Sequence, residues 1–99
     1  MIFFLFTEIL ELCEVIYMNG FEQTDHTAIM FFGDLFRLYT RISDKVVGIL
    51  LRAKKYGLVY FEPEILFQGQ DDETPVFLAK SMQEIYLIYN ENKGFVMPN

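Results

Sequence analysis

One stretch, residues 32–57, most constrains what this chain can fold into, because two helical patterns follow each other there with hardly any linker. The apolar residues of the first pattern recur at intervals of three and four: Leu35, Leu38, Tyr39 and Ile42. Such spacing predicts one buried stripe on a helix. Ser43 then offers an N-cap oxygen, and Asp44 a negative charge, to the start of the next helix. We therefore expect a sharp turn between two helices.

The second pattern predicts a helix over residues 44–56. At about 100° per residue, one face is apolar and is centred on Val46, Ile49, Leu50 and Ala53. The opposite face carries Lys45, Gly48, Arg52 and Lys55, with Lys54 at its border. Gly57 suits the left-handed position that ends a helix. The spacing thus separates a packed side from a basic side.

Positive charge is concentrated in this same stretch. Six of the chain's 8 Lys+Arg lie there: Arg37, Arg41, Lys45, Arg52, Lys54 and Lys55. Only Asp34 and Asp44 oppose them, so the stretch carries +4, and because the whole chain carries −6 the remainder carries −10. Such an asymmetry favours association with an acidic partner. A basic helix stripe is also typical of a merely solvated face, and both interpretations are kept.

Residues 7–18 predict a first helix. Its apolar positions follow helical spacing, with glutamates on the other side: Ile9, Leu12, Cys13, Ile16 and Tyr17 against Glu8, Glu11 and Glu14. Gly20 is expected to take a left-handed conformation at its end, and residues 22–27 to form a loop. Residues 1–6 are apolar and are expected to extend this helix or to pack as a short strand. They lack the basic flank of a signal peptide and are too short to span a membrane.

The remaining patterns are extended. Residues 27–32, 58–62, 65–67 and 76–79 read as short strands, and Gln68-Gly69 turns the chain into the polar run 70–75. Helix, strand, helix, helix and then strands is the element order of a winged helix. We therefore predict an α+β, winged-helix-like domain of three helices with a small antiparallel sheet and a wing.

The last residues depart from that order. Ser81 and Glu84 have the spacing of a capping box before an apolar run, which predicts a helix, although residues 85–89 are equally compatible with a strand. Residues 95–99 form an apolar tail that the pattern does not place. We divide the chain into an apolar extension (1–6), the domain (7–80) and a divergent tail (81–99).

Residue types that carry chemistry are few. The single cysteine, Cys13, falls on the apolar helix face and is expected in the core; one cysteine and one histidine cannot complete a structural zinc site. His26 is expected in a solvated loop. The contiguous acidic run 71–73 lacks the alternation of a calcium loop and is expected to form a solvated wing tip. The sequence thus favours a non-enzymatic protein without a cofactor or metal. A lone cysteine suits a reducing, cytoplasmic setting.

Four groups of residues, in the stretch 32–57 and after it, also carry a family resemblance. They are Phe32 to Phe36, Tyr39 to Lys55, Gly57 to Val59, and Gln68-Gly69 with Asp71-Asp72. On these residues the chain resembles the Costars domain family over residues 7–80. The resemblance implies a winged-helix-like fold that binds actin filaments rather than DNA. It further implies a role in actin cytoskeleton organisation and, through a long N-terminal region found in the family, in Rho and serum-response-factor signalling.

The residues that would contact actin are inferred from charge alone. Because actin is acidic, we expect the contacts to come from Arg37, Arg41, Lys45, Arg52, Lys54 and Lys55. The alternative is a small Costars-type regulator of motility that acts through other actin regulators. A nucleic-acid-binding winged helix is less favoured, because the wing is acidic and the pI is about 4.6. We expect a monomer, associated with the cytoskeleton and not with a membrane.

Overall fold

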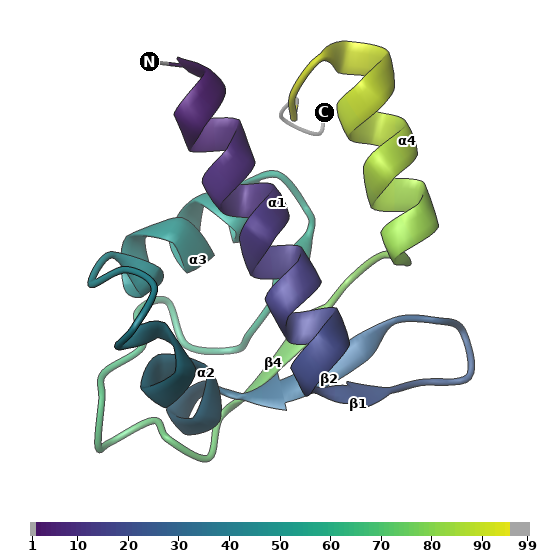
Figure 1. The fold of residues 1–99 in the computed structure, drawn as a ribbon. Coiled ribbons are helices and arrows are strands. Elements are labelled where there is room, and N and C mark those ends of the chain that lie inside the picture. Colours follow the sequence, from purple (N-terminus) through teal and green to yellow (C-terminus); the bar gives the residue numbers. More distant parts are fainter. Residues whose placement is uncertain (1, 96–99) are drawn as a thin grey trace.

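The computed structural model describes the backbone of residues 2–95 and the side chains from Glu8 to Phe95. In chain order the elements are α1 (Ile2–Asn19), β1 (Phe21–Glu22), β2 (Ala28–Phe31), α2 (Phe32–Tyr39), α3 (Val46–Lys55), β3 (Val59–Tyr60), β4 (Pro75–Leu78) and α4 (Met82–Asn92) (Figure 1). The predicted α+β class is confirmed. Among the described residues there are four helices: the three expected for the domain, α1 to α3, and α4, which lies beyond residue 80.

The four strands form one antiparallel sheet in the order β1-β2-β4-β3. Its inner face is apolar, because the alternate residues Ala28 and Met30 of β2 and Val76 and Leu78 of β4 are buried. Helix α1 packs on that face and also contacts α3. The label of winged helix remains a prediction.

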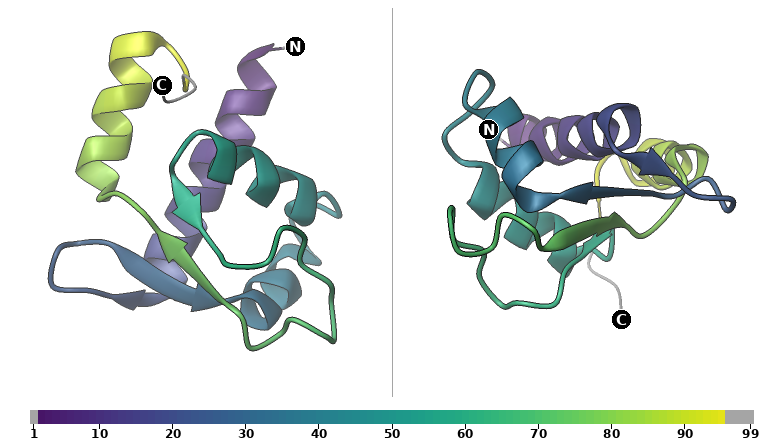
Figure 2. Two further views of the ribbon diagram at one scale, coloured as in Figure 1. Left: turned by 180° about the vertical axis from the view of Figure 1, so that it is seen from behind. Right: turned by 90° about the horizontal axis from the view of Figure 1, so that it is seen from below.

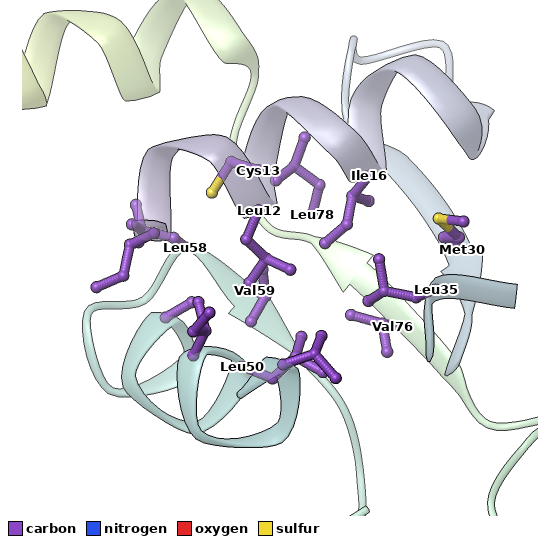
Figure 3. Close-up of a cluster of buried hydrophobic side chains, with 14 of the residues drawn as sticks. Leu12, Cys13, Ile16, Met30, Leu35, Leu50, Leu58, Val59, Val76 and Leu78 are labelled. Atoms are coloured by element: carbon purple, nitrogen blue, oxygen red, sulfur yellow. The ribbon is translucent and has the colours of Figure 1, made fainter. Parts of the chain in front are cut away.

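The core lies between α1, α3 and the inner face of the sheet. Leu12, Cys13 and Ile16 of α1 point toward the sheet and toward Leu50 of α3 (Figure 3). The helical periodicity of the sequence identified these positions correctly because it follows the buried faces of α1 and α3. Gly57 has a φ of 76°, which confirms the left-handed end predicted for α3.

Helix α4 resolves the alternative at residues 81–89 in favour of a helix. The Ser81 side chain caps its start, because Ser81 Oγ accepts a hydrogen bond of 3.2 Å from the backbone N–H of Glu84. Met82 and Ile85 are buried in the common core, and α4 contacts α1. Phe95 is buried as well, with its ring 5.3 Å from that of Tyr89. Residues 96–99 of the predicted tail lie outside the described residues.

Helix α2 is shorter than its apolar stripe predicted. It ends at Tyr39, whose carbonyl accepts hydrogen bonds of 2.9 Å from the N–H groups of both Ile42 and Ser43. The chain thus curls into a turn, and Leu38 and Ile42 are exposed rather than buried. The next helix begins at Val46 and not at Asp44. Ser43 is not its N-cap, although its Oγ accepts a bond of 3.1 Å from the Lys45 N–H just before it.

Gly20 has a different role from the predicted one. Its φ does not lie in the left-handed region, so the expected left-handed conformation is wrong, although α1 does end at Asn19. Instead, a Cβ atom at this position would lie 2.5 Å from the carbonyl oxygen of Ile29 and 2.7 Å from that of Ile16. Glycine is therefore needed where the end of α1 passes close to β2. The expected loop is one residue shorter, because Glu22 belongs to the short strand β1, which pairs with β2, while residues 23–27 form the loop.

The connection between β3 and β4 also differs from expectation. Residues 65–67 form no strand, and Leu66 alone among them is buried. Of the acidic run 71–73, expected at a solvated wing tip, Glu73 is exposed but Asp71 and Asp72 are half-buried. Asp71 Oδ2 accepts a bond of 2.7 Å from the Phe67 N–H, and Asp72 Oδ1 accepts one of 2.8 Å from the Gly69 N–H. These carboxylates hold the loop in a fixed shape.

The same loop is fastened to the start of α2. The backbone carbonyl of Asp72 accepts a 2.8 Å hydrogen bond from the Gly33 N–H, and that of Thr74 accepts one of 2.9 Å from the Phe32 N–H. A Cβ atom on Gly33 would lie 2.8 Å from the Asp72 Cβ, so only glycine permits this approach. The loop carbonyls thus satisfy N–H groups of the first helical turn, which has no side-chain cap.

Candidate basic binding surface

The six predicted site residues fall into two groups in the structure. Arg41, Lys45 and Lys55 are exposed, and within the described part of the chain they form no ion pair. We call these three the open basic residues. Arg37 is exposed too, but its guanidinium forms an ion pair with Asp34, one turn earlier on α2. Arg37 therefore offers less net charge to a partner.

Arg52 is half-buried between α3 and α1. Its Nη2 lies 3.9 Å from Glu8 Oε1, and its Nε is buried without a hydrogen-bond partner among the described residues. The Arg52 side chain thus helps to join two helices instead of projecting into solvent. No pattern in the sequence indicates this contact, because Glu8 lies far from Arg52 in the chain.

Lys54 is also part of the fold. Its ammonium group donates hydrogen bonds to the backbone carbonyls of Phe61, at 2.6 Å, and Pro63, at 3.4 Å. It also lies 4.3 Å from the centroid of the Phe61 ring. Through these contacts Lys54 holds the segment that follows β3 against α3.

The open basic residues follow α3 and the turn before it. Arg41 and Lys45 lie in the turn between α2 and α3, and Lys55 is the last residue of α3. Since α3 rises by about 1.5 Å per residue, Lys45 and Lys55 are separated by about 15 Å along its axis. The positive charge therefore forms an extended strip and not a single cluster.

A half-open hollow of about 240 Å³ lies between the two helices beside this strip. It is lined by Phe36, Tyr39, Thr40, Ser43, Asp44 and Val46. Tyr39 is almost fully buried, and burial, together with the charge of Glu11, raises the pKa of its hydroxyl. The hollow can accept a small apolar side chain, with Arg41 and Lys45 next to it in the chain.

The titratable residues considered for chemistry are not brought together. Cys13 is buried, and burial followed by the charge of Glu14 raises the pKa of its thiol to about 12, so it is neither ionised nor accessible. His26 is exposed in the β1–β2 loop, where its Nδ1 lies 3.3 Å from Glu22 Oε2. Among the described residues no three His, Cys, Asp or Glu side chains could together hold a metal ion. No helix of the described chain has the length and apolar character needed to cross a membrane.

The chain is thus a small α+β domain with exposed basic residues along α3 and the turn before it. The chain belongs to the Costars family, whose model matches residues 5–79. The solution structure of human HSPC280 protein has a similar fold, with a TM-score of 0.70 and 28% identity over 80% of this chain and 95% of that one. Membership of this family points to a non-enzymatic role.

Sequence relatives agree with this assignment. The chain is 51% identical over 76 residues to the actin-binding Rho-activating protein of Mus musculus and 47% identical to that of Homo sapiens. Each match covers 77% of this chain but only 20% of the relative, so the chain corresponds to about a fifth of those proteins. A Costars family protein of Arabidopsis thaliana is 40% identical over 73 residues, which are 72% of this chain and 77% of that protein.

Proposed function

We propose that this domain binds actin filaments through the open basic residues Arg41, Lys45 and Lys55. The observation that carries the proposal is the presence of three exposed cations, with no ion pair to any described residue, on a domain that is 51% identical to a segment of a protein named for actin binding. Actin is acidic, so a positive strip on an otherwise acidic chain is complementary to it. Arg37 lies at the edge of the strip, where its pairing with Asp34 weakens its contribution.

Arg52 and Lys54 take a supporting part in this proposal. Their side chains fix α3 against α1 and against the segment after β3, so they hold the strip in place. Replacing either residue would disturb the fold as well as the charge. A test of binding should therefore leave both intact.

The test is co-sedimentation of the full chain with actin filaments over a series of salt concentrations. We expect pelleting at low salt that decreases as salt rises, because exposed charge pairs are screened. Lys45→Glu and Lys55→Glu should each weaken pelleting severalfold. Lys93→Glu is the matched control, since it makes the same charge change at an exposed residue at the end of α4.

Three results would contradict the proposal. The first is absence of pelleting at low salt, and the second is pelleting that salt does not alter. The third is an equal loss of binding in the Lys93→Glu variant, which would show that only net charge matters. If the chain does not pellet but retains another actin regulator in a pull-down, the indirect mode of action is correct.

On this proposal the chain is a monomeric, cytoplasmic protein associated with the actin cytoskeleton. A contribution to Rho and serum-response-factor signalling would follow from actin binding and not from a separate site. A reporter for serum response factor in cells that express either the chain or its Lys45→Glu variant tests this link. We expect a response only to the form that binds actin.

A further inference from the structure

The outer face of the sheet carries a continuous row of large apolar side chains. Strand pairing places Phe21 opposite Ile29, Ile29 opposite Phe77, and Phe77 opposite Tyr60. Directly paired residues of an antiparallel sheet point to the same face, so one residue from each of the four strands contributes to this row. We call these four residues the aromatic row.

This row faces solvent instead of a helix. Phe21 is 66% exposed and Tyr60 47%, and Phe31, two residues after Ile29 on the same face, is 41% exposed. Helix α1 packs on the opposite face, and in the view from behind no described helix passes in front of the strands (Figure 2, left). Exposed apolar patches of this kind are typical of interaction sites.

Most charged side chains near the aromatic row are carboxylates. The Tyr60 hydroxyl donates a hydrogen bond of 2.7 Å to Glu62 Oε2, and the exposed Glu73 precedes β4. Lys54 is the exception: its Nζ lies 5.5 Å from the centroid of the Tyr60 ring, and its hydrogen bonds to backbone carbonyls hold it there with its charge retained. The chain outside residues 32–57 carries −10. A partner of this face should therefore supply positive charge.

The negative charge around this face excludes two kinds of partner that exposed aromatic side chains could otherwise bind. Aromatic residues on a sheet can stack nucleic-acid bases, but such sheets combine them with a positive groove for the phosphates. Anionic membrane surfaces likewise attract basic and not acidic proteins. What remains is a protein segment that combines apolar side chains with lysine or arginine.

We propose that the aromatic row binds a short cationic, apolar segment of a partner protein, independently of the strip on α2 and α3. The row spans three inter-strand spacings, or about 14 Å, which about five extended residues can cover. Apolar side chains of the segment pack on Phe21, Phe77 and Tyr60, while its lysine or arginine side chains meet the carboxylates at the rim.

The probe is a synthetic peptide of alternating leucine and lysine, titrated into the isotope-labelled full chain and followed by amide chemical shifts. We expect the shifts to centre on residues 21, 29, 60 and 77 and to leave those of Lys45 and Lys55 unchanged. A leucine–glutamate peptide of the same length should not bind. Added salt should weaken binding of the lysine peptide.

Matched variants test the contacts. Phe21→Ser should weaken binding about tenfold, as expected for loss of an aromatic contact residue. Leu87→Ser is its control, since Leu87 is 55% exposed but lies on α4. Glu62→Gln should also weaken binding, whereas Glu91→Gln on α4 should not. Lys45→Glu should leave peptide binding intact, which separates this proposal from actin binding.

Several outcomes would overturn the proposal. One is equal binding of the two peptides, and another is a set of shifts spread over α4 instead of the sheet. Binding to vesicles of anionic lipid, or to a single-stranded oligonucleotide, with shifts on the aromatic row would assign the face to another class of partner. Shifts of the row that depend on protein concentration without any peptide would assign it to a second copy of this chain.

Discussion

At the scale of single residues, Cys13 shows how burial decides chemical character. Its side chain lies in the core formed by α1 and the sheet and has no exposed surface. Removal from water penalises the thiolate, so the pKa rises from an ordinary value of 9.0 to about 12. The thiol therefore stays protonated throughout the neutral range.

We predict that Cys13 does not react with iodoacetamide in the native chain at pH 8. In concentrated guanidinium chloride the thiol is exposed and its pKa returns to the ordinary range, so alkylation should then proceed readily. Mass spectrometry of the intact chain measures the fraction modified. Equal rates of alkylation in the two conditions would show that Cys13 is accessible in the folded state.

The basic residues show what composition reveals and what it does not. Counting charges picks out six candidates, because they concentrate positive charge in residues 32–57. It could not distinguish the open basic residues from Arg52 and Lys54, because the distinction depends on contacts with Glu8 and with the carbonyl of Phe61. The spacing of residues along a helix cannot predict contacts with residues outside that helix.

At the scale of elements, periodicity predicted α1 and α3 because each buries one face of a regular helix. It failed where tertiary contacts determine the outcome. The predicted stripe of α2 included Ile42, but the chain turns after Tyr39 and leaves this residue exposed. Residues 65–67 resemble a strand, yet no neighbouring strand pairs with them, and the carboxylate of Asp71 fixes the loop instead.

Two glycines provide a matched test of these element contacts. We predict that Gly33→Ala destabilises the chain by about 1–3 kcal/mol, since the added Cβ would lie 2.8 Å from Asp72 Cβ and force the loop away from α2. Gly48→Ala should instead stabilise it by about 0.5–1 kcal/mol, because Gly48 lies within α3 and nothing is within 4 Å of its added Cβ. Urea denaturation measures both. The same sign for both substitutions would contradict this account.

The contact between α1 and α4 should depend on pH. The Tyr86 hydroxyl donates a hydrogen bond to Glu14, which raises the pKa of Tyr86 from 10.0 to about 12. Because the folded-state pKa is the higher one, this stabilisation is complete below pH 10 and is lost as the pH rises through 12. We predict that Tyr86→Phe lowers stability at pH 8 by less than about 1 kcal/mol, as for an exposed hydrogen bond.

Denaturation curves at a series of alkaline pH values check this prediction. The difference in the free energy of unfolding between the Tyr86→Phe variant and the natural chain should shrink toward zero as the pH approaches 12. Leu87→Ala, at the neighbouring exposed position, is a control that should show a difference independent of pH. A Tyr86→Phe difference that stays constant up to pH 12 would contradict the role of the hydrogen bond.

At the scale of the whole molecule, the fold class could be predicted because element order restricts how a chain this short can pack. The division at residue 80 remains a prediction, and the structure suggests how to test it. Met82, Ile85 and Phe95 belong to the same core as α1 and α3. The last segment therefore contributes to the stability of the family region.

We predict that a chain ending at Lys80 is less stable than the full chain by several kcal/mol. Burial of a large apolar side chain contributes about 2 kcal/mol, and three such side chains would be lost. Thermal unfolding followed by circular dichroism measures the effect. Unchanged stability of the shortened chain would establish residues 81–99 as an appendage, as the sequence indicated.

The edges of the sheet have a consequence for behaviour at high concentration. Its outermost strands, β1 and β3, each contribute only two paired residues, Phe21–Glu22 and Val59–Tyr60. An incoming strand from another chain would find little backbone on which to extend the ladder, so growth of fibrils by edge-to-edge addition has a poor template. Although the chain has 11 Phe and exposes an aromatic face, its short edge strands limit polymerisation by strand addition.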